Sequence, residues 1–165
     1  MNQIRRIQNQ ADLLELTRQF IALNPLDGTQ KRFGIYHMKS DNPFCVLAKH
    51  VEAVVFWDAF KNDESTLDKE YGAYEKYCNY ILAVDHVECR PVGAFRLMMN
   101  SALGLKTINA ITEPPWSCKL DDIIQLNDIT TSFERMCDVS TLAILPEYRS
   151  SSGYYLGLAL YLSLA

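Results

Sequence analysis

The sequence predicts a single α/β domain in which helices flank a mixed, mostly antiparallel central sheet. Two observations carry this expectation. Residues 80–99 form two β-prone runs joined by a short polar turn, which is typical of a β-hairpin. Residues 135–165 form a β-prone run, a polar loop and an apolar helical stretch. Segments of helical and extended character follow one another along the remaining chain, an order typical of a sheet covered by helices.

Length and charge narrow the class further. The 165 residues fit one domain, with 1–30 as an N-terminal helix and turn and 31–165 as the core. Apolar residues make up 48% and charged residues 22%, the balance of an ordinary globular protein. The net charge is −4, so no basic surface for nucleic acid is indicated.

The N-terminal half is expected to contain three helices and one strand. Apolar residues recur every three or four positions over 12–23, which predicts a helix that ends before Pro25. Residues 32–38 indicate a strand, and 43–62 an apolar helix. Ser65 and Asp68 fit a capping box at the start of a further helix that continues to about residue 80.

The C-terminal half is expected to contain most of the sheet. The hairpin strands span 80–85 and 91–99, and an irregular segment follows over 101–115. Acidic residues suit the first turn of a short helix at Leu120–Leu126. The strand at 135–145 is followed by a polar turn and a helix over 154–165.

Several classes of site are not indicated. The five scattered cysteines form neither a disulfide framework nor a CxxC pair, and the three histidines lie on separate elements, so no metal site is expected. No secretory leader is visible, and the longest uncharged run is shorter than the ~20 residues of a membrane span. We therefore expect a cytoplasmic protein with reduced, mostly buried thiols.

The run Leu142-Ala143-Ile144-Leu145-Pro146-Glu147-Tyr148-Arg149 resembles the central strand–loop–helix motif of the GNAT acyltransferase superfamily. The runs WDAF, EYGAYE, YILAVD and VGAFRL precede it, at 57–60, 70–75, 80–85 and 92–97. This order is similar to that of acyl-homoserine-lactone (autoinducer) synthases, ornithine-lipid acyltransferases and long-chain N-acyl amino acid synthases. It looks closest to a bacterial branch of that group. The resemblance covers roughly residues 45–165.

The resemblance implies an N-acyltransferase that moves an acyl group from a thioester to an amine of a small molecule. The donor would be acyl-CoA or the phosphopantetheine of acyl carrier protein. Direct aminolysis requires no nucleophile from the protein. The backbone of the strand would pair with the pantetheine amides, and the following loop would bind phosphate at a helix N-terminus. The residues so implied are Leu142, Ala143, Ile144, Arg149, Ser150, Ser151, Ser152, Gly153 and Tyr154. The serines could equally cap the helix without a ligand.

The resemblance also implies catalytic and substrate-binding residues. Asp138 stands where the relatives carry the carboxylate of a Glu-x-x-Arg segment and would accept the amine proton. Arg96 is the second catalytic candidate, as a structural contact or a contact to a substrate carboxylate. The alternatives are a solvent-facing Asp138 or a structural Asp138–Arg96 ion pair. Trp57, Glu70 and Glu75 would bind the amine substrate, with a solvated helix face as the alternative for the two glutamates.

Two departures from the family pattern leave a second interpretation open. The loop at 149–155 has one glycine rather than the usual two, and the chain stops at the final helix. A catalytically degenerate GNAT-like module that binds an acyl group or a protein partner is the alternative function. The apolar helix 154–165 and the β-prone strand 139–145 would be covered by a second copy in a homodimer, or by the remainder of a longer protein.

Overall fold

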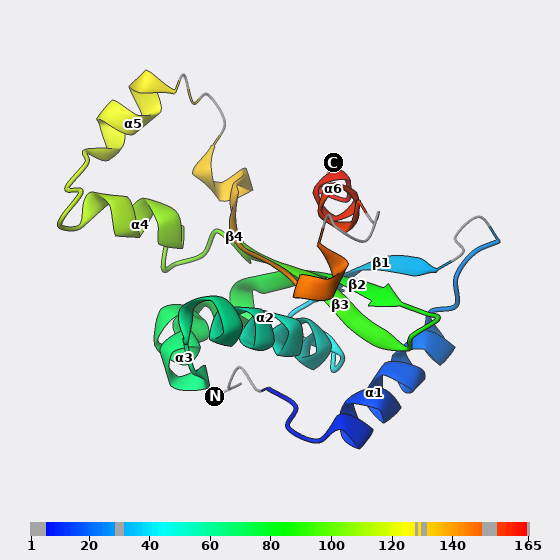
Figure 1. The fold of residues 1–165 in the computed structure, drawn as a ribbon. Coiled ribbons are helices and arrows are strands. Elements are labelled where there is room, and N and C mark those ends of the chain that lie inside the picture. Colours follow the sequence, from blue (N-terminus) through cyan, green and yellow to red (C-terminus); the bar gives the residue numbers. More distant parts are fainter. Residues whose placement is uncertain (1–5, 29–31, 128, 130–131, 150–154, 165) are drawn as a thin grey trace.

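The computed structural model describes residues 6–28, 32–127, 129, 132–149 and 155–164. A four-stranded sheet lies at its centre, and helices flank it (Figure 1). The strands are β1 (Phe33–Lys39), β2 (Cys78–Asp85), β3 (Arg90–Met99) and β4 (Cys137–Ile144). They lie side by side in the order of the chain, and each neighbouring pair is antiparallel. The sheet is thus antiparallel throughout the described chain: a short turn joins β2 to β3, whereas helices lie in the β1–β2 and β3–β4 connections.

Helices cover both faces of this sheet. Helices α1 (Gln10–Leu23) and α2 (Cys45–Phe60) lie on one face, and α6 (Leu156–Leu162) lies on the other (Figure 1). Helix α3 (Glu64–Tyr71) and the 3₁₀ helix Gly72–Tyr77 connect α2 to β2. Helices α4 (Lys106–Thr112) and α5 (Leu120–Leu126) extend away from the sheet beyond β4 (Figure 1). The N-terminal helix α1 and the C-terminal helix α6 therefore lie on opposite faces of the sheet.

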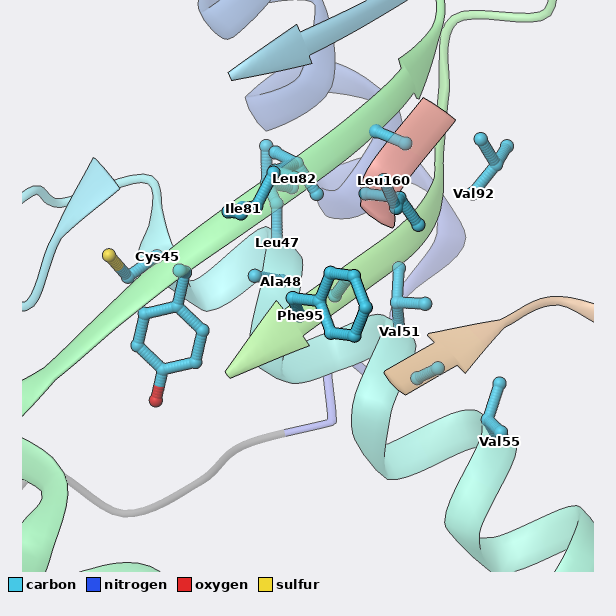
Figure 2. Packing of buried hydrophobic residues seen from close by; sticks show 14 of the residues in the cluster. Cys45, Leu47, Ala48, Val51, Val55, Ile81, Leu82, Val92, Phe95 and Leu160 are labelled. Carbon is cyan, nitrogen blue, oxygen red and sulfur yellow. The ribbon is translucent and has the colours of Figure 1, made fainter. Parts of the chain in front are cut away.

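The main core lies between α2 and the sheet. Leu47, Ala48 and Val51 of α2 are fully buried, as is Leu82 of β2 (Figure 2). Strands β2 and β3 are buried along almost their entire length because they occupy the middle of the sheet and carry helices on both faces. This is why both hairpin strands are apolar on both faces, rather than alternating.

Helix α6 approaches β3 closely at a glycine. A Cβ atom on Gly93 would lie 3.0 Å from Leu160 Cδ1 and 3.4 Å from Leu156 Cδ2. The rings of Phe95 and Tyr161 meet edge to face, with their centroids 5.1 Å apart. Leu156 and Leu160 are buried by this contact, so one side of α6 is packed against the sheet.

Three sequence-based expectations are corrected by the structure. The cap of α3 is Asp63, whose Oδ1 accepts a 2.8 Å hydrogen bond from the Thr66 amide, and not Ser65. The helix ends at Tyr71 rather than near residue 80, and a 3₁₀ helix follows. The segment expected to be irregular contains α4, which has no buried residue and so leaves no apolar periodicity to detect.

The cysteine prediction is confirmed only in part. All five cysteines are free, but only Cys45 and Cys78 are buried. Cys118 and Cys137 are exposed because they lie in the peripheral segment around α5 and at the outer edge of the sheet.

None of the helices described in the structure has the length and apolar character required to cross a bilayer.

Candidate functional site

A cluster of four charged side chains is buried between α2 and the sheet. Lys49 and Glu52 come from α2, Glu75 from the 3₁₀ helix and Arg96 from β3, and we call these residues the buried charge cluster. Their side chains are between 1% and 8% exposed. Charged groups at this depth are rare unless they are paired, so their pairing is the first question.

Each charge in the cluster has a partner of opposite sign. Arg96 donates from Nε to Glu52 Oε1 at 3.0 Å and from Nη1 to Glu75 Oε2 at 2.8 Å, and it also pairs through Nη2 with Glu52. Lys49 pairs with Glu75. The hydroxyl of Thr141 donates to Glu52 at 2.6 Å, and that of Tyr80 donates to Glu75 at 2.7 Å. Two cations and two carboxylates therefore form a network with no net charge.

The register of the sheet explains how these residues meet. Arg96 stands opposite Tyr80 of β2 on one side and opposite Thr141 of β4 on the other. All three side chains lie on the face covered by α2, which supplies the carboxylate of Glu52. The guanidinium also lies over the Tyr71 and Tyr80 rings, at 4.8 Å and 5.1 Å from their centroids.

The pKa shifts follow from burial and pairing. Burial disfavours the charged guanidinium, but Glu52 and Glu75 outweigh it and raise the pKa of Arg96 well above its ordinary value. Burial alone would raise the pKa of Glu75, yet Arg96 and Lys49 lower it. Burial also raises the pKa of Cys78 to about 11, so this neighbouring thiol stays protonated at neutral pH. Arg96 and Glu75 are therefore held ionised and hydrogen-bonded, a state suited to orienting groups rather than to accepting a proton.

Asp138 does not join this cluster. It pairs with Met98 in the register of β3 and β4, and its Oδ2 accepts a 2.9 Å hydrogen bond from the Thr107 amide in the first turn of α4. The side chain thus acts as a cap for a short helix. The expected alternatives, a solvent-facing Asp138 or an Asp138–Arg96 ion pair, are both wrong, because Asp138 is 9% exposed and Arg96 is neutralised by two glutamates.

The residues expected to bind the amine substrate are spread over different surroundings. Glu75 is buried in the cluster, which excludes the solvated helix face for this residue. Glu70 is half exposed and forms an ion pair of 2.8 Å with Lys106 of α4. Trp57 lies near the end of α2, is 42% exposed and has the Lys61 ammonium over its ring at 5.8 Å. The structure thus unites Arg96 with Glu75 but leaves Trp57 and Glu70 apart from them.

The expected donor site lies at the edge of the sheet. Leu142 is partly exposed, Ala143 is buried and Ile144 is half-buried beneath α6. The Ile144 carbonyl accepts a 3.0 Å hydrogen bond from Arg149 Nε. The register shifts between Thr141 and Val139, so Ser140 is an extra residue without a partner on β3, which is a β-bulge. The loop residues Ser150, Ser151, Ser152, Gly153 and Tyr154 lie outside the described part of the chain.

Sequence reasoning missed most of the buried charge cluster. Lys49, Glu52 and Thr141 were not singled out, although one signal was available. Lys49 and Glu52 are charged residues in the middle of an otherwise apolar helix, where a solvated face is hard to accommodate. Their partners are 44 and 26 residues away in sequence, so no local pattern identifies them.

Within the residues that the structure describes, no three or more His, Cys, Asp or Glu side chains gather in a way that could hold a metal ion. In comparison with known proteins, no family model, no curated protein and no solved structure matches this chain.

Proposed function

We propose that this protein is an N-acyltransferase that moves an acyl group from a thioester to the amine of a small molecule. One observation carries the proposal. Strand β4 lies at the edge of the described sheet, has a bulge at Ser140 and leads through the turn Pro146–Tyr148 toward α6, with the carboxylate of Asp138 near its start. This arrangement combines an open backbone edge, a distorted strand and an acid.

The backbone of β4 supplies a site for the donor. The Leu145 amide donates to the Val92 carbonyl at 3.0 Å, so the backbone N–H and C=O of Leu145 point toward β3. The backbone groups of the preceding Ile144 therefore point away from β3, and those of Leu142, two residues earlier, do so as well. Pantetheine carries two amides that can pair with these outward groups in the manner of an added strand. Arg149 Nε donates to the Ile144 carbonyl, and this hydrogen bond would have to break for pantetheine to pair there.

The reaction needs an oxyanion donor and a proton acceptor. The amine nitrogen attacks the thioester carbonyl, a C–N bond forms, the C–S bond breaks and the thiol leaves with a proton. A backbone N–H at the Ser140 bulge could donate to the tetrahedral oxyanion, because a bulge removes a residue from the ladder. The carboxylate of Asp138 would accept the proton that the amine nitrogen loses.

The proposal predicts the effect of replacing Asp138. Asp138→Asn keeps an oxygen for the Thr107 amide but removes the base, so acyl transfer should fall by about 10²–10⁴ with the fold retained. Release of free thiol from acetyl-CoA, long-chain acyl-CoA and acyl carrier protein, each with a panel of amines, is the measurement. Asp121→Asn on α5 is the matched control and should behave as wild type. Wild-type rates in Asp138→Asn would remove this residue from the mechanism.

A module that binds an acyl group without catalysis is the second candidate. It is favoured by the hydrogen bond from the Thr107 amide, which already occupies the Asp138 carboxylate. A thermal-shift screen with the same donors separates the two functions. Stabilisation by a donor without thiol release supports the binding module, and stabilisation with release supports the enzyme. No stabilisation and no release would contradict both.

A further inference from the structure

A cavity of about 460 Å³ lies on the side of α2 that faces the N-terminal segment. Its walls come from five parts of the chain: the residues just before α1, the first turns of α1, the middle of α2, the β2–β3 turn and the residue after β4. This volume is in the range of small-molecule sites, which are usually formed where several elements meet. The cavity is separate from the edge of β4 and from the buried charge cluster, so none of the function proposed above accounts for it.

Two of the three charged side chains that described residues contribute to the wall of this cavity are arginines, and Gln8 and Gln10 add side-chain amides. Arg6 is half-buried and forms no ion pair or hydrogen bond among the described residues, and Arg90 reaches out to Glu147 at 2.7 Å. Glu88 is the one acidic side chain in the wall formed by described residues, and it is exposed. The positive charge of Arg6 is therefore not compensated by a bonded protein carboxylate.

His50 adds a donor of defined orientation. Its Nδ1 accepts a 3.1 Å hydrogen bond from the Ile7 amide, so this nitrogen carries no proton. The neutral ring must then carry its proton on Nε2, which has no bonded partner among the described residues. Burial, with Arg6 and Arg90 nearby, lowers the pKa of His50 to about 4 and keeps the ring neutral at pH 7. The imidazole is 8% exposed and lines the cavity, so its position is set by packing.

The remaining wall is apolar. Ile7, Ala11, Leu13, Leu14, Val54 and Leu145 contribute aliphatic surface to the same cavity. A ligand that matches both kinds of wall has an anionic head for Arg6 and His50 and a short alkyl chain for the aliphatic side. A carboxylate suits this combination, because a guanidinium binds it through two parallel hydrogen bonds and a neutral imidazole N–H can add a third.

We infer that this cavity, between the segment before α1, α2 and the β2–β3 turn, binds a short-chain aliphatic monocarboxylate through Arg6 and His50. Arg6 is the residue to substitute, because it forms no ion pair or hydrogen bond with the described residues that the substitution would break. Removing one charge-assisted contact from such a site weakens binding on the order of tenfold to a hundredfold. Arg18 of α1 is exposed and outside the cavity, so Arg18→Gln makes the same change of charge elsewhere.

The experiment is a calorimetric titration of the full chain with hexanoate, inorganic phosphate and hexylamine at neutral pH. Binding of hexanoate alone, weakened tenfold or more in Arg6→Gln and unchanged in Arg18→Gln, is the expected result. A hexanoate-dependent shift of the His50 imidazole resonances gives a second readout in the unmodified protein. Equal binding by Arg6→Gln and wild type, equal binding of hexylamine, binding of phosphate but not hexanoate, or no binding at all would each overturn the assignment. None of these outcomes depends on acyl transfer.

Discussion

At the scale of single residues, Arg96 is the member of the buried charge cluster that connects the sheet to α2 and to the 3₁₀ helix. It links α2 through Glu52 and the 3₁₀ helix through Glu75, and it stands beside Thr141 of β4 in the sheet register. A buried ion pair stabilises little compared with an apolar replacement of both partners, but removal of one partner leaves a buried charge without compensation. The cluster therefore constrains what can replace each of its members.

Arg96→Met should strongly destabilise the fold. It removes the cation that pairs with Glu52 and one of the two cations that pair with Glu75, and breaking a buried pair in this way costs about 3–5 kcal/mol. Chemical denaturation followed by circular dichroism measures the loss. Arg90→Gln is the control, because Arg90 and Glu147 are both about half exposed and an exposed pair contributes about 0–1 kcal/mol. Similar midpoints for the two variants would contradict a structural role for the cluster.

His50 predicts a dependence of stability on pH. Its pKa is lowered from 6.5 to about 4 in the folded chain, so the unfolded chain binds more protons between these values. The contribution of the neutral ring is complete above about pH 6.5 and is lost as the pH falls toward 4. His50→Gln keeps an acceptor for the Ile7 amide and should flatten the stability curve in this window. Urea denaturation across the window is the measurement. A slope that is unchanged from wild type would rule His50 out, and His37→Gln, at an exposed position of β1, serves as the control.

At the scale of elements, α6 has one side packed against the sheet and the opposite side exposed to solvent. Leu156 and Leu160 are buried over Gly93, while Leu158 is 56% exposed on the opposite side. The helix is apolar nearly all round, so its sequence alone does not say which side meets the sheet. The absence of a side chain at Gly93 provides the space that selects Leu160.

Leu160→Ala should therefore cost about 2–5 kcal/mol, as expected for a fully buried leucine truncated within a packed core. Leu158→Ala removes the same atoms from the same helix and should change the free energy of unfolding by no more than about 0.5 kcal/mol. Equilibrium unfolding of both variants gives the comparison. Equal effects would mean that α6 does not pack on β3 in the way described.

At the scale of the whole molecule, exposed apolar side chains gather on α6 and the neighbouring edge strand. Leu158, Tyr161 and Leu162 of α6 are 54–67% exposed, and Val139 and Leu142 of β4 are 48% and 37% exposed. Within the described chain β4 has no strand on its outer side. The exposed apolar side of α6 can be covered by a second copy of the same surface about a two-fold axis, which leaves the backbone edge of β4 to the donor.

We expect the purified chain to self-associate through this surface. Light scattering should give a mass above that of the 18.9 kDa monomer. Leu162→Glu places a charge on the exposed side of α6 and should shift the distribution toward monomer, because burying an unpaired carboxylate is costly. Glu64→Ala, on α3, is a control remote from the surface. A wild-type chain that stays monomeric at high concentration would refute the expectation.

Much of the fold is predictable from sequence for a local reason. The β2–β3 hairpin and the helix Leu120–Leu126 were expected where they occur, since strand propensity, a short turn and acidic first-turn residues are all local signals. Helix α4 could not be found in this way, because it buries nothing and depends on Asp138 from a strand 31 residues later for its cap. A mixed, mostly antiparallel sheet was expected, and the described strands are all antiparallel. The order of the strands was not predicted, since sheet neighbours are chosen by the packing of segments far apart in the chain.

The sequence by itself determined the α/β class, the hairpin and the positions of most helices, because these follow from side-chain periodicity within a few residues. Only the tertiary structure decided which charges meet. Glu52, Glu75, Arg96 and Thr141 come from four separate elements, and their ion pairs exist because α2 crosses the sheet where β3 places its arginine. Burial then decides their chemistry. A charge removed from water must pair with an opposite charge or a hydrogen-bonding group within a few ångströms. Such pairs are set by the packing of distant segments rather than by neighbours in the chain.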